Sequence, residues 1–358
     1  RLAKSDEIIR LAGFFGRTLH DLVRPDEPLV DLGEQLRAAA EKIQGPDQEA
    51  LFQAIDDLQR LAEDYRELER IVHAPLRFNY PAQTTINARL DPAEFADAEA
   101  QRDRQRLGLG DQPVMNLRAM LEWDVGLRIF YLDLPSAVAG MYAYHAELGA
   151  CLVVNHKHPP ERRRVSMLHQ YASMLVDRFK PHIAALARPT RKPASERFAD
   201  AFALAFLLPA TSIRQRFHNI VTSTNDFQVA DLRRLAHFYF VSVESMAQRL
   251  EQLGLIAKGS WERISGANFA PREAAESGLR PQPINDQLYP ERYQFLAVSA
   301  YERDEIGETN LAHFLRCDIV TAREIVANTL TSREVVEATG EERDVRLDFQ
   351  KSLLAAAS

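Results

Sequence analysis

Cysteine is scarce in this sequence, and long apolar runs and an excess of positive charge are absent. Its 358 residues include two cysteines, Cys151 and Cys317, which lie far apart. Two distant cysteines do not form a disulfide framework, so we expect a protein of a reducing compartment, the cytoplasm. No apolar run approaches the roughly 20 residues that cross a bilayer, so no membrane span is expected. We find no signal peptide, although the sequence starts at Arg1 rather than Met and a preceding leader stays open.

The charge balance argues against a general affinity for nucleic acid. Lysine and arginine number 44 against 51 acidic residues, which gives a formal net charge of −7 at pH 7. A chain of this charge is not expected to bind nucleic acid non-specifically as a whole, although a local basic face is compatible with it. The hydrophobic content of 46% and charged content of 27% are ordinary for a globular protein. The length suffices for roughly two or three domains, and we find no internal repeat.

Helical periodicity dominates the first 112 residues. Residues 5–23 predict a helix, a break near Gly16 and a shorter helix. Residues 46–73 predict a long amphipathic helix, and residues 74–112 a linker that passes into a charged helix. The apolar positions of the long helix follow at steps of three and four: Leu51, Ile55, Leu58, Leu61, Tyr65, Leu68 and Val72. This stripe fits either a coiled-coil seam between two copies or packing within its own domain.

Residues 113–260 predict one α+β domain. The segment LRIFYLDL is rich in β-branched and aromatic residues and predicts a strand, and GMYAYHAELGACLVVNH predicts a hairpin that turns near Gly149. A helix around His169, a Pro/Arg-rich loop and the helix SERFADAFALAFLLP follow. Residues 231–256 then predict helix, turn and helix, with Ser242 as the N-cap of the second helix.

The remainder, residues 261–358, predicts a helical C-terminal domain. A Gly/Pro-rich loop is followed by the helical segments PERYQFLAVSAYERDEI, NLAHFLRC and IVTAREIVANTL. The last two have the outline of a helix-turn-helix, for which either DNA contact or packing against the domain is possible. Cys317 lies between apolar positions and is predicted to be a buried small hydrophobic residue. A charged tail follows Ser332.

One helix carries the outline of a zinc-peptidase motif. The stretch RRRVSMLHQYASMLVDRF holds His169-Gln170-Tyr171-Ala172-Ser173 where a zinc peptidase has H-E-x-x-H. In that motif two histidines at i and i+4 bind the metal from one helix face, and the glutamate takes a proton from the metal-bound water.

With its flanking segments, this helix resembles the ImmA/IrrE family of zincin-like metallopeptidase domains, which are often fused behind an XRE-type helix-turn-helix. LRIFYLDL through RRRVSMLH is similar to the strand, hairpin and first helical turns of that domain. ERFADAFALAFLLP is similar to the family helix E-x-x-A-N-x-F-A-x-x-L-L-x-P, with Asp200 at the Asn position. LRRLAHFYFVSVESMAQRLEQLGLI resembles the helical element that closes the domain. RLAKSDEIIRLAGFFGRTLHDLV resembles the last part of an XRE domain, whose DNA-reading helix is expected before Arg1.

The resemblance implies an α+β, mainly helical fold. A zincin-like domain with a small β-sheet is expected at 113–260. The end of an XRE-like domain at 1–30 and a coiled-coil-like linker or dimerisation region at 31–112 precede it. A helical C-terminal region at 261–358 follows it.

Within this resemblance, two of the positions that carry the chemistry have changed. His169 is kept, and Glu196 matches the third ligand of the family. Gln170 stands at the position of the base and has no ionisable oxygen, while Ser173 replaces the second histidine and its neutral hydroxyl is a poor zinc ligand. Since two ligands do not normally hold zinc, we expect no catalytic residue, no cofactor and a buried, hydrogen-bonded His169.

Four further residues are candidates for replacement ligands that would restore zinc binding: Asp177, Asp200, His182 and His237. Asp200 is the best placed, because it follows Glu196 by one helical turn and shares its face. The others have structural interpretations: Asp177 as a solvated charge beside Arg178, His182 as a loop residue, and His237 as a packed or surface histidine.

Basic and aromatic residues near these helices admit both functional and structural interpretations. The run Arg162–Arg164 is suited to phosphate, but we favour a structural role in which it flanks the helix and pairs with carboxylates. Arg233, Arg234 and Arg249 lie on the helix-turn-helix-like element, which the resemblance assigns to the peptidase domain rather than to DNA reading. Phe202, Phe206 and Leu207 are expected in the core.

Three functional hypotheses follow. The first is a cytoplasmic XRE-family transcriptional regulator that binds DNA as a homodimer, with an inactive ImmA/IrrE-like domain that senses a peptide or small molecule in the old substrate cleft. The second is an active zinc metalloendopeptidase that cleaves a repressor. The third is an interaction protein without catalysis, such as an antitoxin or a defence-system regulator.

Overall fold

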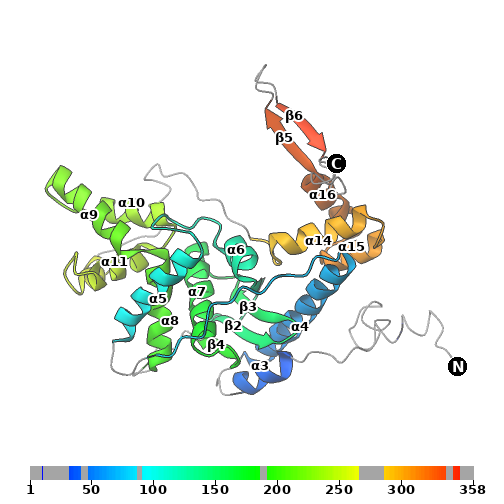
Figure 1. The fold of residues 1–358 in the computed structure, drawn as a ribbon, viewed down its shortest axis with the longest axis horizontal. Coiled ribbons are helices and arrows are strands. Elements are labelled where there is room, and N and C mark those ends of the chain that lie inside the picture. The colour runs from blue at the N-terminus through cyan, green and yellow to red at the C-terminus, as the bar shows by residue number, and fades with distance from the viewer. Residues whose placement is uncertain are drawn as a thin grey trace. The chain divides into compact units, whose positions relative to one another are not determined.

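The structure is a computed structural model that describes Arg10 and residues 32–41, 47–86, 91–185, 192–265, 286–335 and 342–346 (Figure 1). The predicted helices of residues 5–23 and the XRE-like segment at 1–30 therefore lie outside the described residues, apart from Arg10. The chain divides into two compact units. The first contains Leu32–Glu63 and Pro75–Glu291, and the second contains Asp64–Ala74 and Arg292–Ser358.

The first unit is built on a four-stranded mixed sheet of order β1-β3-β2-β4. Strand β1 (Arg128–Leu132) runs parallel to β3 (Gly149–Asn155), which forms the predicted antiparallel hairpin with β2 (Val138–His145). Every residue of β1 and β3 is buried, as their near-continuous apolar runs indicate. Strand β4 (His182–Ala185) pairs antiparallel with β2 and places His182 opposite Tyr142.

Two long helices carry the predicted motif, and one of them covers the sheet. Helix α7 (Pro160–Val176) packs on β2 and β3, and α8 (Ala194–Leu207) packs on both α7 and α5 (Pro92–Arg106). In Figure 1 these helices lie together beside the sheet. Helix α5 starts where Asp91 accepts a hydrogen bond from the backbone N–H of Ala93. The sequence assigned α5 to the linker region, but it packs in the same unit as the sheet. The apolar residues of α8 predicted in the core, Phe202, Phe206 and Leu207, are buried, and so is Phe198.

Shorter helices complete the first unit. These are α3 (Leu32–Ala40), α6 (Leu117–Met120), the π-helix η1 (Leu121–Val125), α9 (Ala210–Thr224), α10 (Val229–Tyr239), α11 (Val243–Gln252) and α12 (Ser260–Ser265). The predicted N-cap is confirmed, because the Ser242 side chain accepts a hydrogen bond from the backbone N–H of Ser245. Helix α9 was not among the predicted elements. Pro209, which ends α8, is also the residue from which α9 starts.

The second unit contains the end of the long predicted helix, now α4 (Gln48–Ile71), with α14 (Glu291–Glu302), α15 (Glu308–Phe314) and α16 (Ile319–Leu330). A hairpin of β5 (Thr331–Val335) and β6 (Glu342–Arg346) follows, where the sequence indicated only a charged tail. The seven apolar positions predicted for this helix, from Leu51 to Val72 just beyond its end, are all buried within the single chain. Their burial favours packing within the chain over an open seam between two copies.

The expected fold class is confirmed: the described chain is mainly helical, with one small mixed sheet and a separate hairpin. Across the described ranges, no helix is both long enough and apolar enough to cross a membrane.

Candidate metal centre

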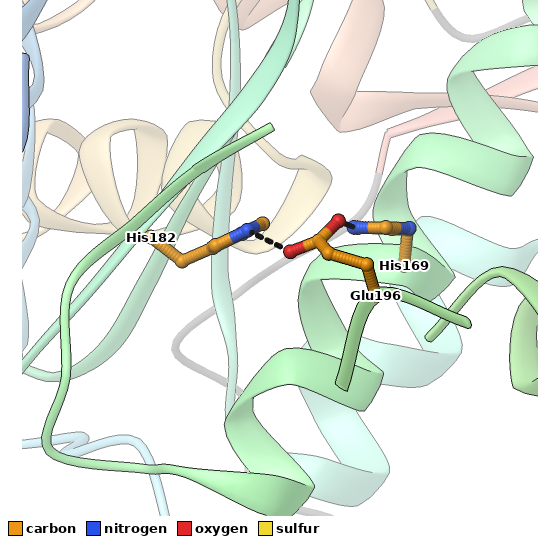
Figure 2. A group of neighbouring side chains, drawn as sticks. All are labelled: His169, His182 and Glu196. Atoms are coloured by element: carbon orange, nitrogen blue, oxygen red, sulfur yellow. Dashed lines mark hydrogen bonds and ion pairs between the residues drawn. The ribbon is translucent and has the colours of Figure 1, made fainter. Parts of the chain in front are cut away.

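Three side chains from three different elements converge beside the sheet. His169 comes from α7, Glu196 from the first turn of α8 and His182 from β4 (Figure 2). One carboxylate faces both imidazole rings: Glu196 Oε1 lies 2.8 Å from His182 Nε2, and Glu196 Oε2 lies 3.3 Å from His169 Nε2. One ligand atom from each residue lies within 4.8 Å of the other two, so the group is compact enough to surround a single ion.

The outer nitrogen of each imidazole faces its own acceptor. His169 Nδ1 lies 3.2 Å from Asp200 Oδ1, and His182 Nδ1 lies 3.1 Å from the side-chain oxygen of Gln170. An amide oxygen can only accept a hydrogen bond, and an ionised carboxylate likewise, so both Nδ1 atoms carry the proton. Each Nε2 faces a carboxylate oxygen of Glu196, and an Nε2 that gives up its own proton can present its lone pair to a metal there.

The centre is buried on the α7 side and accessible on the other. His169 is 9% exposed and Gln170 is fully buried, whereas the side chains of His182 and Glu196 are 24% and 31% exposed. Within the described part of the chain, His169 Nε2 makes no hydrogen bond, although Glu196 lies at ion-pair distance. Its partner is therefore the charge of the Glu196 carboxylate rather than a well-aligned hydrogen bond.

The charges of the group are strongly coupled. Burial lowers the pKa of His169, but its hydrogen bond to Asp200 and its contact with Glu196 outweigh burial and raise that pKa to about 9. The contacts with His169 and then His182 hold the pKa of Glu196 far below its ordinary value. Burial raises the pKa of Asp200, but the hydrogen bonds from His169 and Lys192 more than offset this and leave it lowered. Without a metal, both carboxylates are therefore ionised at neutral pH and His169 is protonated.

The ligand set expected from an H-E-x-x-H helix does not fit here. The hydroxyl of Ser173 donates to the backbone oxygen of His169, 3.0 Å away, and so is engaged with its own helix. Gln170 lies over Gly140 of β2. A Cβ at that glycine would approach the amide nitrogen of Gln170 to 3.4 Å and the backbone oxygen of Val153 to 2.5 Å. The glycine thus leaves room for the backbone oxygen of Val153 and for the side chain of Gln170.

Of the four candidate replacement ligands, the structure places only one in the converging group. His182, which was interpreted as a loop residue, lies in strand β4 and is part of the group; that interpretation is wrong. Asp200, the best placed in the sequence, contacts the outer nitrogen of His169 instead of joining the group. Among the described residues, the metal-competent group includes neither Asp177, which is exposed at the end of α7, nor His237.

The arginines near the motif have structural partners. Arg163 is buried, pairs with Asp286 and lies over the ring of Tyr131. Arg164 is also buried and donates to the backbone oxygens of Val114 and Met115. The structural interpretation of this run therefore holds for Arg163 and Arg164, whereas Arg162 is exposed.

Two other predicted positions also have clear environments. Arg249 of α11 is buried, donates to the backbone oxygen of Leu208 and pairs with Asp97, so it is not available to DNA. The prediction of a buried Cys317 is wrong, because this side chain is only partly covered beside the exposed N-cap of α16.

A cavity of about 390 Å³ lies elsewhere in the first unit. Its lining includes Phe95, Glu99, Arg106 and Leu175, and none of the three converging residues. Its volume falls in the range of small-molecule pockets. Its lining carries charges of both signs, so it does not specify the charge of a ligand.

Comparison with known proteins defines the class of this domain. Residues 124–251 match the model of the IrrE N-terminal-like domain, the family Peptidase_M78. The matched range contains the sheet, α7, α8 and all three converging residues. No curated protein matches. Among solved structures, a Mycobacterium tuberculosis transcriptional regulator is 20% identical with a TM-score of 0.30, over 52% of this chain. This chain spans about half of that protein, 51% of its length.

Proposed function

We propose that this chain is part of an XRE-family transcriptional regulator whose IrrE-like domain binds a ligand or partner without cleaving it. The proposal combines the domain match at 124–251 with the resemblance of residues 1–30 to the end of an XRE domain. DNA would be bound through that XRE domain, by a homodimer in the cytoplasm.

The observation that carries the non-hydrolytic role is the environment of Gln170. This side chain is fully buried, and its oxygen faces His182 rather than a site for water. An amide has no ionisable oxygen, so it cannot take a proton from an attacking water. The neighbouring carboxylates are engaged as well, since Glu196 faces both imidazoles and Asp200 contacts His169 and Lys192. A domain in which no base is available to activate water is suited to binding a ligand without cleaving it.

A mobility-shift experiment tests the regulatory role. The full-length protein, confirmed as a dimer, is mixed with DNA from upstream of its own coding region at moderate salt. We expect a discrete retarded complex that competitor DNA of unrelated sequence does not remove. Absence of that complex would overturn the regulatory proposal.

A zinc-dependent hydrolase is the second candidate, and the convergence of His169, His182 and Glu196 is the observation that favours it. A bound zinc would supply a polarised water in this function. The test is incubation of the zinc-supplemented protein with a mixture of unrelated peptides, followed by mass spectrometry. We expect no cleavage. Chelator-sensitive cleavage would move the hydrolase to first place.

A further inference from the structure

The group of side chains beside β4 includes a histidine that is not part of the H-E-x-x-H pattern. We propose that His169, His182 and Glu196 bind a divalent transition metal of the zinc type, with His182 of strand β4 in place of a second helical histidine. The proposal goes beyond the regulatory function and does not depend on it. A protein that binds the metal but not DNA would refute only the regulatory function.

The spacing of the ligand atoms suits such an ion. Zinc binds nitrogen and oxygen at about 2.0–2.2 Å in tetrahedral geometry, which separates neighbouring ligand atoms by roughly 3.3–3.5 Å. Glu196 Oε2 and His169 Nε2 are 3.3 Å apart, and Glu196 Oε1 and His182 Nε2 are 2.8 Å apart. One ligand atom from each of the three residues lies within 4.8 Å of the other two, so side-chain adjustments suffice to bring all three to coordination distance. Two histidines and one glutamate, with a fourth position open, are an established zinc-binding set.

Both histidines are also oriented as metal ligands require. A metal-binding histidine usually donates its other N–H to a carboxylate or a carbonyl, which fixes the tautomer and the ring. Asp200 takes this position for His169, and Gln170 takes it for His182. Gln170 is thus a positioning residue for the relocated ligand. Gln170, at the position of the base, and His182, in place of the second histidine, therefore act together, because the amide oxygen orients the imidazole.

The local charge favours a cation. Glu196 and Asp200 contribute two negative charges, and Lys192 pairs with Asp200 on the outer side. With neutral imidazoles the group has a net charge of −1, which a divalent ion reverses to +1. A metal ion would replace the proton through which His169 Nε2 now contacts Glu196. Imidazole nitrogens select zinc and its transition-metal neighbours over magnesium and calcium, which prefer oxygen ligands.

Equilibrium titration of the metal-free protein with Zn²⁺, in competition with a chromogenic chelator, tests this site. We expect one ion per chain. His182→Gln should lower the affinity at least about 100-fold, because loss of a ligand exceeds the 10–100-fold cost of losing an outer partner. His237→Gln, a histidine outside the group, should stay within about twofold of the wild type. Absence of Zn²⁺ binding, or equal affinity of His182→Gln and wild type, would overturn the proposal.

Two further measurements sharpen the test, and the second keeps it decisive if His182→Gln fails to fold. Adding Ser173→His to this variant places a second imidazole at i+4 from His169, and should restore at least about tenfold of the lost affinity. X-ray absorption of the zinc-loaded wild-type protein needs no variant. It should detect two imidazole ligands and no sulfur, and a site with one imidazole or none would contradict the assignment.

Discussion

Each of the two units holds a carboxylate beside a histidine, but the two carboxylates have different partners. In the second unit, Asp64 is 1% exposed, pairs with Arg316, and has His313 Nε2 at 3.9 Å. In the first unit, Glu196 faces two imidazoles, and an arginine is not among the contacts described for it.

The two partners differ in whether they can release a proton and bind a metal instead. A guanidinium is permanently charged and has no lone pair, so the pair of Asp64 and Arg316 can only stabilise the fold. An imidazole can lose its proton and offer the same nitrogen to a metal. The Glu196 group therefore has two states, protonated or metal-bound, whereas the ion pair of Asp64 with Arg316 has one.

Replacing each carboxylate by its amide should separate metal binding from fold stabilisation. Of all the changes proposed, this pair should give the largest difference in zinc affinity. Glu196→Gln should lower zinc affinity at least about 100-fold, because it removes the only anionic ligand. Asp64→Asn should leave zinc affinity within about twofold but cost about 2–3 kcal/mol of stability, since it leaves Arg316 without its buried partner. Zinc titration and urea denaturation of both variants check this. Equal loss of zinc in both would contradict the comparison.

The metal-free protein should show a pH dependence that originates at His169. The pKa of His169 is raised from 6.5 to about 9, so its stabilisation is complete below pH 6.5 and is lost as the pH rises through 9. The lowered pKa of Glu196 acts in the opposite direction, and its stabilisation is lost as the pH falls below about 4.5. Stability from this group should therefore be greatest between about pH 4.5 and 6.5.

The size of the alkaline loss is at most about 3 kcal/mol, because one pKa unit corresponds to about 1.4 kcal/mol and both partners report the same interaction. Urea denaturation midpoints of the wild type and His169→Gln, measured with chelator from pH 6 to pH 10, isolate this contribution. The groups that face His169 are Glu196, Asp200 and His182. If the two proteins showed the same pH dependence, the assignment to His169 would be wrong.

Changes at Gln170 should have an intermediate effect on the metal. Gln170→Met removes the acceptor for His182 Nδ1 and should weaken zinc binding about 10–100-fold. Gln170→Glu keeps an acceptor at that position and should stay within about threefold of the wild type. The same zinc competition assay measures both. A methionine variant with unchanged affinity would show that Gln170 does not orient His182.

The smallest effect is expected at Ser173. Its hydroxyl donates to the backbone of its own helix, so Ser173→Ala should change zinc affinity by less than about twofold. A loss comparable to that of His182→Gln would place Ser173 among the ligands and contradict the relocation.

The sequence predicted the helical frame of this centre but not its third member. The periodicity of residues 46–73 and the cap at Ser242 depend on local rules, and the structure confirms both. The same holds for the helices that carry His169 and Glu196. Strand β4 has only four residues within a Pro/Arg-rich segment, and it is defined by pairing with β2, about forty residues earlier. Such non-local pairing is not visible in a local pattern.

The role of Gln170 could not be predicted from the sequence either. From sequence its amide is only the loss of a base. Its contact with His182 depends on a strand that was not predicted and on the space above Gly140. Proline offered no signal for this strand either, because it favours extended backbone in the residue before it, whereas His182 follows Pro181.

The zinc content of the purified protein tests the central claim most directly. Wild type and His182→Gln are prepared from zinc-supplemented culture without chelator or histidine tag, and metal is measured by elemental analysis. The relocated site predicts about one zinc per chain in the wild type and essentially none in His182→Gln. A wild-type protein without zinc, or a variant that retains it, would contradict the account.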